Sequence, residues 1–167
     1  MSDTKTVYLV AVAADPVVVR VEGRACFQNC RCLKEFFATM TGRGQTRFVL
    51  DLARCTGMDS TFLGVVAGAA IELRGRAPAG ALIVRSPGPR NLELLRNLGL
   101  HRLLTVVEDI ATSENPCTPL DCQPEKSELA NARLALEAHQ NLVAVDATNQ
   151  ARFEDVLVFL QNRVGQG

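Results

Sequence analysis

The chain has 167 residues, 18 basic and 18 acidic side chains, and 47% hydrophobic against 22% charged residues. This balance is that of an ordinary globular protein with room for one domain and an extension. A net charge near zero lacks the basic footprint of nucleic-acid-binding proteins, so we expect no direct contact with nucleic acid. The polar N-terminus and the lack of an apolar run near ~20 residues predict neither a signal peptide nor membrane insertion, and favour a cytoplasmic protein.

Two apolar runs at the start of the chain predict a β-hairpin. Residues 6–13 are almost wholly apolar, and residues 17–22 end in an alternating apolar and polar pattern. Pro16 lies in the short turn between them, where its fixed φ suits a reversal of the chain. We expect the hairpin to end at Gly23.

Helices and strands alternate after the hairpin. The predicted helices cover 26–41, 61–75 and 89–98, and the predicted strands cover 47–52, 81–84 and 103–107. Cys26, Cys30 and Leu33 begin an apolar stripe at helical spacing in the first of these helices. The order β-β-α-β-α-β-α-β predicts an α/β fold in which right-handed parallel crossovers follow an antiparallel hairpin, so that the sheet is mixed.

The helix at 61–75 is rich in small residues, with Gly64 and Gly68 near its middle. We expect these small residues to let the helix approach the sheet closely. Ser60 immediately precedes the helix, and its hydroxyl is suited to accept a hydrogen bond from a free amide of the first turn. The sequence therefore predicts Ser60 as the N-cap.

The C-terminal third of the chain has a different character. We predict a first domain over 1–112, a polar, Pro-containing linker over 113–125, and a helical hairpin over 126–167. The apolar stripes of this hairpin need a partner surface. The hairpin can pack on the domain as a lid, pair with a second copy of the chain to form a homodimer, or dock another protein, and the sequence favours none of the three.

The six cysteines carry no CxxC spacing and so lack the signature of a zinc ribbon or a thioredoxin-like site. Cys26 and Cys30 fit the apolar stripe of a helix and are interpreted as core residues. Cys117 and Cys122 flank a Pro-containing loop, where a redox or metal role is the alternative to an ordinary structural one. Without a secretory context, we expect all the thiols to be reduced.

Signs of catalysis are scarce. The two histidines, His101 and His139, are predicted at a helix end and on a surface helix, and both are interpreted as ordinary polar residues. Common motifs for nucleophilic, metal-dependent or phosphate-binding chemistry are missing. We therefore predict no catalytic residues, no metal and no cofactor; a small enzyme remains the least favoured alternative.

One segment is informative about function. A strand that ends in Asp51-Leu52 is followed by a short loop and then by Met58-Asp59-Ser60-Thr61-Phe62-Leu63-Gly64, which opens a helix. Asn97-Leu98-Gly99-Leu100 precedes the last strand. These features resemble the STAS domain (sulfate transporter and anti-sigma factor antagonist), in particular the bacterial anti-sigma factor antagonists, over residues 6–112. The order of elements is also that of the family.

The resemblance implies a non-enzymatic binding switch. In the anti-sigma factor antagonists, the serine after the aspartate is phosphorylated by an anti-sigma factor with serine-kinase activity, and the unmodified protein binds that factor. Carried over, Ser60 is the phosphorylation site, with Thr61 as second choice. Partner contacts are expected from Asp59, Ser60, Thr61, Phe62 and Leu63. Residue chemistry alone favours Ser60 as only an N-cap, and the resemblance is what favours phosphorylation.

The chain departs from the family pattern in two places. Phe62 stands where the family has glycine, and as a large side chain it either blocks a kinase or anchors a different partner. Gly23-Arg24-Ala25-Cys26 lacks an acidic residue that often follows the second strand. The alternative function is a STAS subunit of a lipid-transport ATPase (an ABC system) or of a signalling scaffold, which binds protein without phosphorylation.

Overall fold

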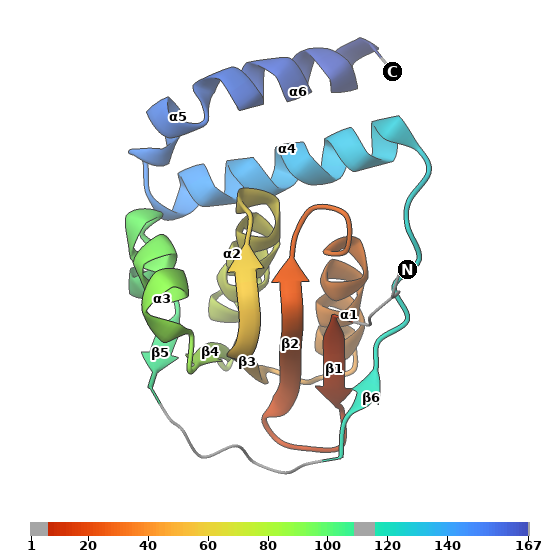
Figure 1. The fold of residues 1–167 in the computed structure, drawn as a ribbon, viewed down its shortest axis with the longest axis vertical. Coiled ribbons are helices and arrows are strands. Elements are labelled where there is room, and N and C mark those ends of the chain that lie inside the picture. Colours follow the sequence, from red (N-terminus) through yellow and green to blue (C-terminus); the bar gives the residue numbers. More distant parts are fainter. Residues whose placement is uncertain (1–6, 109–115, 167) are drawn as a thin grey trace.

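A computed structural model describes residues 7–108 and 116–166 (Figure 1). Within these residues, six strands form one sheet in the order β5-β4-β3-β2-β1-β6. The strands are β1 Tyr8–Ala11, β2 Val17–Ala25, β3 Arg47–Met58, β4 Ala81–Arg85, β5 Thr105–Val107 and β6 Thr118–Pro119. The helices are α1 Arg31–Gly42, α2 Ser60–Arg74, α3 Gly88–Asn97, the 3-10 turn η1 Leu100–Arg102, α4 Glu128–Val145, α5 Asn149–Arg152 and α6 Glu154–Gln166.

The predicted mixed sheet is confirmed. β1 pairs with β2 antiparallel, whereas the pairs β2–β3, β3–β4 and β4–β5 are parallel. Each parallel step needs a crossover, which α1, α2 and α3 supply. β6 was not predicted; it joins the free edge of β1 antiparallel, where Val10 lies opposite Thr118.

Alternation along the central strands sorts the side chains between two faces of the sheet. Val17, Val19 and Val21 of β2 lie in the main hydrophobic cluster with α1 and α2, which lie together behind the sheet in Figure 1. Val18 and Val49 face the other way and belong to a small second cluster. This two-residue period places the larger part of the core under the helices.

The second face of the sheet carries a buried charge cluster. Asp51 is 1% exposed, and its Oδ2 lies 3.1 Å from an Arg85 nitrogen and 3.9 Å from Arg20 Nε. The three residues occupy matched positions on neighbouring strands. Pairing with two guanidinium groups offsets the desolvation of the carboxylate. The aspartate of the predicted Asp-Leu step thus has a structural role in the sheet.

Two predicted boundaries near the end of β2 are wrong. The strand continues beyond Gly23 to Ala25, because Gly23 adopts a φ of 85° and the register shifts between Gly23 and Arg24. The first helix begins at Arg31 and not at residue 26. Asn29 explains this: its Oδ1 accepts from Cys26 N at 3.0 Å and from Tyr8 Oη at 2.9 Å, so residues 26–29 form a fixed turn.

The predicted helical hairpin is present and packs on the domain. α4 crosses the end of the sheet at which β2 and β3 finish and lies against α2, while α6 runs back along the outer side of α4 (Figure 1). Leu134, Ala138 and Leu142 are buried in the main hydrophobic cluster together with the sheet residues. Packing on the domain is thus confirmed, while pairing with a second copy and docking of another protein stay predictions.

The segment predicted as a free linker is fastened over its described residues, 116–125. β6 pairs with β1, and a disulfide joins Cys122 to Cys32 of α1, with a Cα–Cα distance of 5.2 Å. The expectation that all thiols are reduced is therefore wrong for this pair, because the fold brings together two residues 90 positions apart whose proximity the sequence does not show. Residues 113–115 of the predicted linker lie outside the described residues.

In the part of the chain that the structure describes, no helix combines the length and the apolar character needed to cross a membrane.

Candidate functional site

The start of α2 is held by Asp59. Its Oδ1 accepts a hydrogen bond from Phe62 N at 2.9 Å, which makes Asp59 the N-cap. The prediction of Ser60 as N-cap is thus wrong by one residue: Asp59 has the extended backbone of a cap, and Ser60 is the first residue of the helix. Oδ2 of Asp59 accepts from Phe27 N at 2.8 Å, so the same carboxylate also fixes the turn before α1.

The Ser60 hydroxyl is engaged by the C-terminal extension. Ser60 Oγ lies 2.8 Å from His139 Nε2, and His139 Nδ1 lies 2.7 Å from the carbonyl of Ala135. A carbonyl only accepts, so Nδ1 carries the proton; in the neutral ring Nε2 is then the acceptor and Ser60 donates. His139 is 4% exposed, so the prediction that it lies on a surface is wrong.

The serine and histidine resemble a nucleophile paired with a base. Asp59 already accepts the hydrogen bond of the first-turn amide of Phe62, so this amide is not free to stabilise a developing negative charge. Within the described residues, no group of three or more His, Cys, Asp or Glu side chains could hold a metal ion. In the described residues, His139 thus holds the Ser60 hydroxyl at the start of α2.

The two glycines of α2 make room for α4. A Cβ at Gly64 would overlap the backbone of Ala138, and one at Gly68 would lie 2.5 Å from Asn141 Nδ2. The same Asn141 amide donates to the carbonyl of Gly64 at 3.1 Å. We expected these glycines to face the sheet, and this is wrong: they form the contact surface for the extension.

The predicted partner-contact residues divide into two groups. Thr61, Phe62 and Leu63 are 7%, 0% and 0% exposed, whereas Asp59 and Ser60 are only half-buried. Phe62 stacks on Tyr8 with ring centroids 6.4 Å apart, so it neither blocks the serine nor forms an exposed anchor. In this conformation Thr61, Phe62 and Leu63 cannot contact a partner, because the helix turns them into the core. Asp59 and Ser60 remain predictions for the partner surface.

Phe27 is an exposed aromatic residue that the sequence analysis did not select. It is 56% exposed and its backbone is bonded to Asp59, so its ring lies beside the start of α2. Exposed aromatic side chains of this kind are common anchors in protein interfaces. The available signal was that Phe27 lies off the apolar stripe that begins with Cys26, Cys30 and Leu33, next to the polar residues Gln28 and Asn29.

Burial keeps the groups around this turn uncharged. Burial raises the pKa of Tyr8 far above its usual value, and its hydroxyl donates to Asn29. Burial also raises the pKa of the Cys30 thiol to about 12, with a further contribution from the nearby Asp59 carboxylate. The Cys55 pKa is raised as well, mainly by burial. These thiols remain protonated near neutral pH and lack the thiolate that reactive cysteines need.

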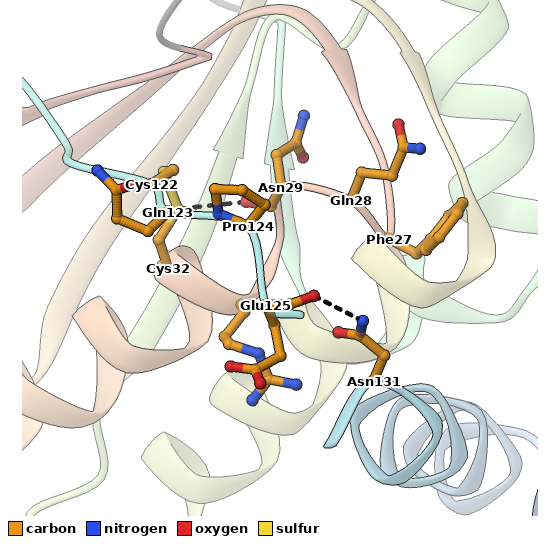
Figure 2. A pocket seen from close by; sticks show the side chains of 10 residues that line it. Phe27, Gln28, Asn29, Cys32, Cys122, Gln123, Pro124, Glu125 and Asn131 are labelled. Carbon is orange, nitrogen blue, oxygen red and sulfur yellow. Dashed lines mark hydrogen bonds between the residues drawn. A yellow bond between two sulfur atoms is a disulfide. The ribbon is translucent and has the colours of Figure 1, made fainter. Parts of the chain in front are cut away.

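A pocket of about 320 Å³ lies between the turn before α1 and the segment that leads into α4. Figure 2 shows Phe27 at one end of it and the Cys32–Cys122 disulfide at the other, with Asn131 of α4 below. Asn131 Nδ2 donates to the carbonyl of Glu125 at 3.0 Å, which ties α4 to that segment. The disulfide therefore faces an open pocket.

Comparison with known families identifies the domain. A family model described as "Mlab, STAS domain" matches residues 9–107, which is 99 of the 167 residues. The chain belongs to the STAS domain family. The site described above, from the end of β3 to the first turn of α2, lies within this STAS domain, and α4 to α6 lie beyond the match.

A solved structure described as "Structure of the Anti-Sigma Factor Antagonist SpoIIAA in its Unphosphorylated Form" has the same fold. It is 22% identical, with a TM-score of 0.52, and the match covers 63% of this chain and 89% of that one. The similarity supports the STAS fold predicted from the sequence. A comparison with curated proteins gave no match.

Proposed function

We propose that this STAS protein is an anti-sigma factor antagonist whose binding to an anti-sigma factor with serine-kinase activity is controlled by phosphorylation of Ser60. The observation that carries the proposal is the position of Ser60 as the first residue of α2, directly after the capping Asp59. The likeness in fold to a protein named as an anti-sigma factor antagonist supports it. In this proposal residues 1–112 form the STAS domain, and 126–167 form an extension that regulates it.

A phosphate at this position acts on a docked partner through its charge. It adds about −1.5 to −2 charges at pH 7, and the positive end of the α2 dipole tolerates them. A partner docked over Asp59 and the exposed Phe27 would meet this new charge directly. A tenfold change in affinity needs only ~1.4 kcal/mol, which one phosphate placed in an interface readily supplies.

The test uses the full chain from its native host, tagged and captured with and without phosphatase, and read by mass spectrometry. We expect an anti-sigma kinase among the bound proteins after phosphatase treatment and its loss when Ser60 carries phosphate. The purified kinase with Mg-ATP is then applied to wild type, Ser60→Ala and Thr61→Ala. Phosphate should be absent only from Ser60→Ala. If that variant is still modified, and phosphorylation leaves the complex intact, the proposal is wrong.

A second candidate is a STAS binding subunit that works without phosphorylation, as in a lipid-transport ATPase or a signalling scaffold. The engagement of the Ser60 hydroxyl by His139 favours it, since a serine used only for packing needs no access. The matched family model is described by the name Mlab, whereas the matched solved structure is described as an anti-sigma factor antagonist. This candidate predicts a complex with a transporter ATPase that persists with ATP present and with Ser60→Ala.

A further inference from the structure

We propose that α4 is an autoinhibitory lid over Ser60, and that the Cys32–Cys122 disulfide keeps this lid closed until a dithiol reductant opens it. The inference rests on the proposed function for its kinase readout. Opening of the lid is measured separately, on the protein alone.

The closed lid and a phosphorylated Ser60 exclude each other. The hydroxyl donates to His139 Nε2 at 2.8 Å, so a phosphoryl group on Oγ would occupy the space that the imidazole ring fills. A kinase also has to reach Oγ in line with its phosphate, and α4 covers this approach because its backbone at Ala138 lies against Gly64. Phosphorylation therefore requires α4 to move away from the first turn of α2.

Apolar packing and reversible polar contacts together hold the first half of α4 to the domain. Leu134 and Ala138 are buried in the main hydrophobic cluster. Arg31 donates to the carbonyl of Ala130 at 2.9 Å, and Lys34 pairs with Glu137 at 2.9 Å. The Lys34–Glu137 pair is at least 41% exposed on both side chains, a setting in which ion pairs contribute little. None of these contacts is covalent, so all of them break when α4 opens, and its buried apolar side chains then meet water.

The disulfide is the covalent fastening of the lid. Cys32 lies in the first turn of α1, and Cys122 precedes the first residue of α4, Glu128, by only six residues. Six residues span at most about 20 Å, so an intact disulfide keeps the start of α4 close to α1 at a high effective concentration. After reduction, β6, with two residues, is the last regular element that holds the described chain before α4.

The reduction is a simple dithiol exchange. The two thiols of an external dithiol give up two electrons and two protons and join in their own disulfide; the Cys32–Cys122 S–S bond breaks, and each sulfur receives one proton. Access comes from the open pocket that both cysteines line (Figure 2). Cys30 does not compete internally, because the attacking species is a thiolate and Cys30 stays protonated in its buried position.

Hydrogen exchange with mass spectrometry tests the opening on the full-length protein, before and after dithiothreitol. We expect the amides of α4 and of the first turn of α2 to exchange about tenfold faster after reduction, while those of β3 and β4 are unchanged. Cys122→Ser should exchange like the reduced protein without any reductant. Cys117→Ser is the matched control: it lies in the same segment, keeps the disulfide, and should still respond to dithiothreitol.

Three results would overturn the lid. The first is that peptide mapping of the air-oxidised protein finds no Cys32–Cys122 bond; the second is that exchange in α4 does not change on reduction. The third is that β3 and β4 accelerate together with α4, which would mean that reduction loosens the whole domain. Wild type with reductant needs no substitution, so a poorly folding variant cannot obscure the outcome.

The kinase readout separates this inference from the proposed function. With the captured anti-sigma kinase, we expect Ser60 phosphorylation to be about tenfold faster in reduced wild type and in Cys122→Ser than in oxidised wild type. Equal rates in both redox states would overturn the lid and leave the antagonist function standing. No phosphate on Ser60 in any state, with α4 opening as expected, would overturn the function and leave the lid standing.

Discussion

The STAS domain and the C-terminal extension are held in place by different kinds of interaction. The sheet is built from continuous backbone ladders and aliphatic side chains, such as those along β2 and β3. The extension adds apolar burial to specific contacts with Ser60, Gly64 and Gly68 of α2. Many surfaces can cover a hydrophobic stripe. The contacts with Ser60, Gly64 and Gly68 fit only one helix in one register, so they specify how the extension packs over this site.

Buried polar pairs fix the far end of the extension in the same way. Asn149 is fully buried, and its Nδ2 donates to the carbonyls of Leu98 and Leu142 at 3.0 and 2.8 Å. Asp146 lies against Gly99, where a Cβ would come within 2.7 Å of its carboxylate. Each hydrogen bond adds only about 1 kcal/mol, but leaving such groups unpaired costs more, so they specify position.

The largest expected effect comes from truncating one core side chain in the extension and one in the STAS domain. Leu142 of α4 and Leu50 of β3 are 0% and 1% exposed and share one hydrophobic cluster. Leu142→Ala and Leu50→Ala should each lower the free energy of unfolding by about 3 kcal/mol. Urea unfolding followed by circular dichroism of the oxidised protein should give a single transition for both variants, because the two regions share a core.

Separate unfolding of α4 in Leu142→Ala would contradict the idea that the two regions share one core. If α4 unfolds in a separate, earlier transition while the sheet keeps the wild-type midpoint, the extension is an independent unit. The shared cluster would then contribute nothing to the stability of the STAS domain.

The next effect tests the fit between α2 and α4. In an exposed helix, Gly→Ala stabilises by up to about 1 kcal/mol. At Gly64 we expect the opposite sign, a loss of about 2 kcal/mol, because the new Cβ overlaps the backbone of Ala138. Thermal unfolding measures both signs, and faster hydrogen exchange in α4 should accompany the loss.

Gly165→Ala in α6 is the matched control, since no atom lies within 4 Å of the position that its new Cβ would take. It should be neutral or slightly stabilising. Stabilisation by Gly64→Ala as well would show that α4 does not lie on α2 in solution.

The contrast between the two regions also explains how far the sequence was informative. The STAS domain was predictable because apolar residues repeat every two residues in strands and every 3.6 residues in helices. The motif from Asp59 to Gly64 indicates the candidate site. Adjacent residues carry these signals. The one-residue error at the N-cap and the late start of α1 arise from side chains, those of Asp59 and Asn29, that compete for backbone groups in ways that spacing does not show.

The contacts of the extension were not predictable because they join residues far apart in the chain. Ser60 and His139 are 79 positions apart, and Cys32 and Cys122 are 90 apart. A helix with an apolar stripe shows that it needs a surface, but its sequence does not name that surface. The glycines of α2 were visible, yet a sheet and a second helix are equally good reasons for small residues, and here the second helix is the one that needs them.

Alkaline pH should destabilise the STAS domain, because the buried Cys30 thiol resists ionisation in the folded state. Burial raises the pKa of this thiol to about 12, above its unfolded value of 9.0, so the folded state retains a proton that the unfolded state loses. The associated stability is complete below pH 9 and is lost as the pH rises toward 12, with about 1 kcal/mol gone by pH 10. Raised proton affinity of buried Tyr8 acts in the same direction.

Urea titrations at pH 8 and pH 10 on wild type and Cys30→Ala measure this loss. The variant has a constant packing defect, but its stability should fall less between the two pH values. If the free energy of unfolding falls equally in both proteins between pH 8 and pH 10, burial does not raise the pKa of Cys30.

The smallest effect concerns the hydrogen bond that joins the two regions at the site. A double-mutant cycle of Ser60→Ala and His139→Ala should give a coupling energy of about 0.5 to 1 kcal/mol. The edge-to-face contact of His139 with Phe153, with ring centroids 5.0 Å apart, is lost in both variants that change His139 and so cancels from the coupling. The same cycle with Thr148→Ala in place of Ser60→Ala should give no coupling, since Thr148 bonds to Asp146 and not to His139. A coupling near zero for Ser60 would mean that the hydroxyl is free in solution, and α4 would then leave the serine open to a kinase in every redox state.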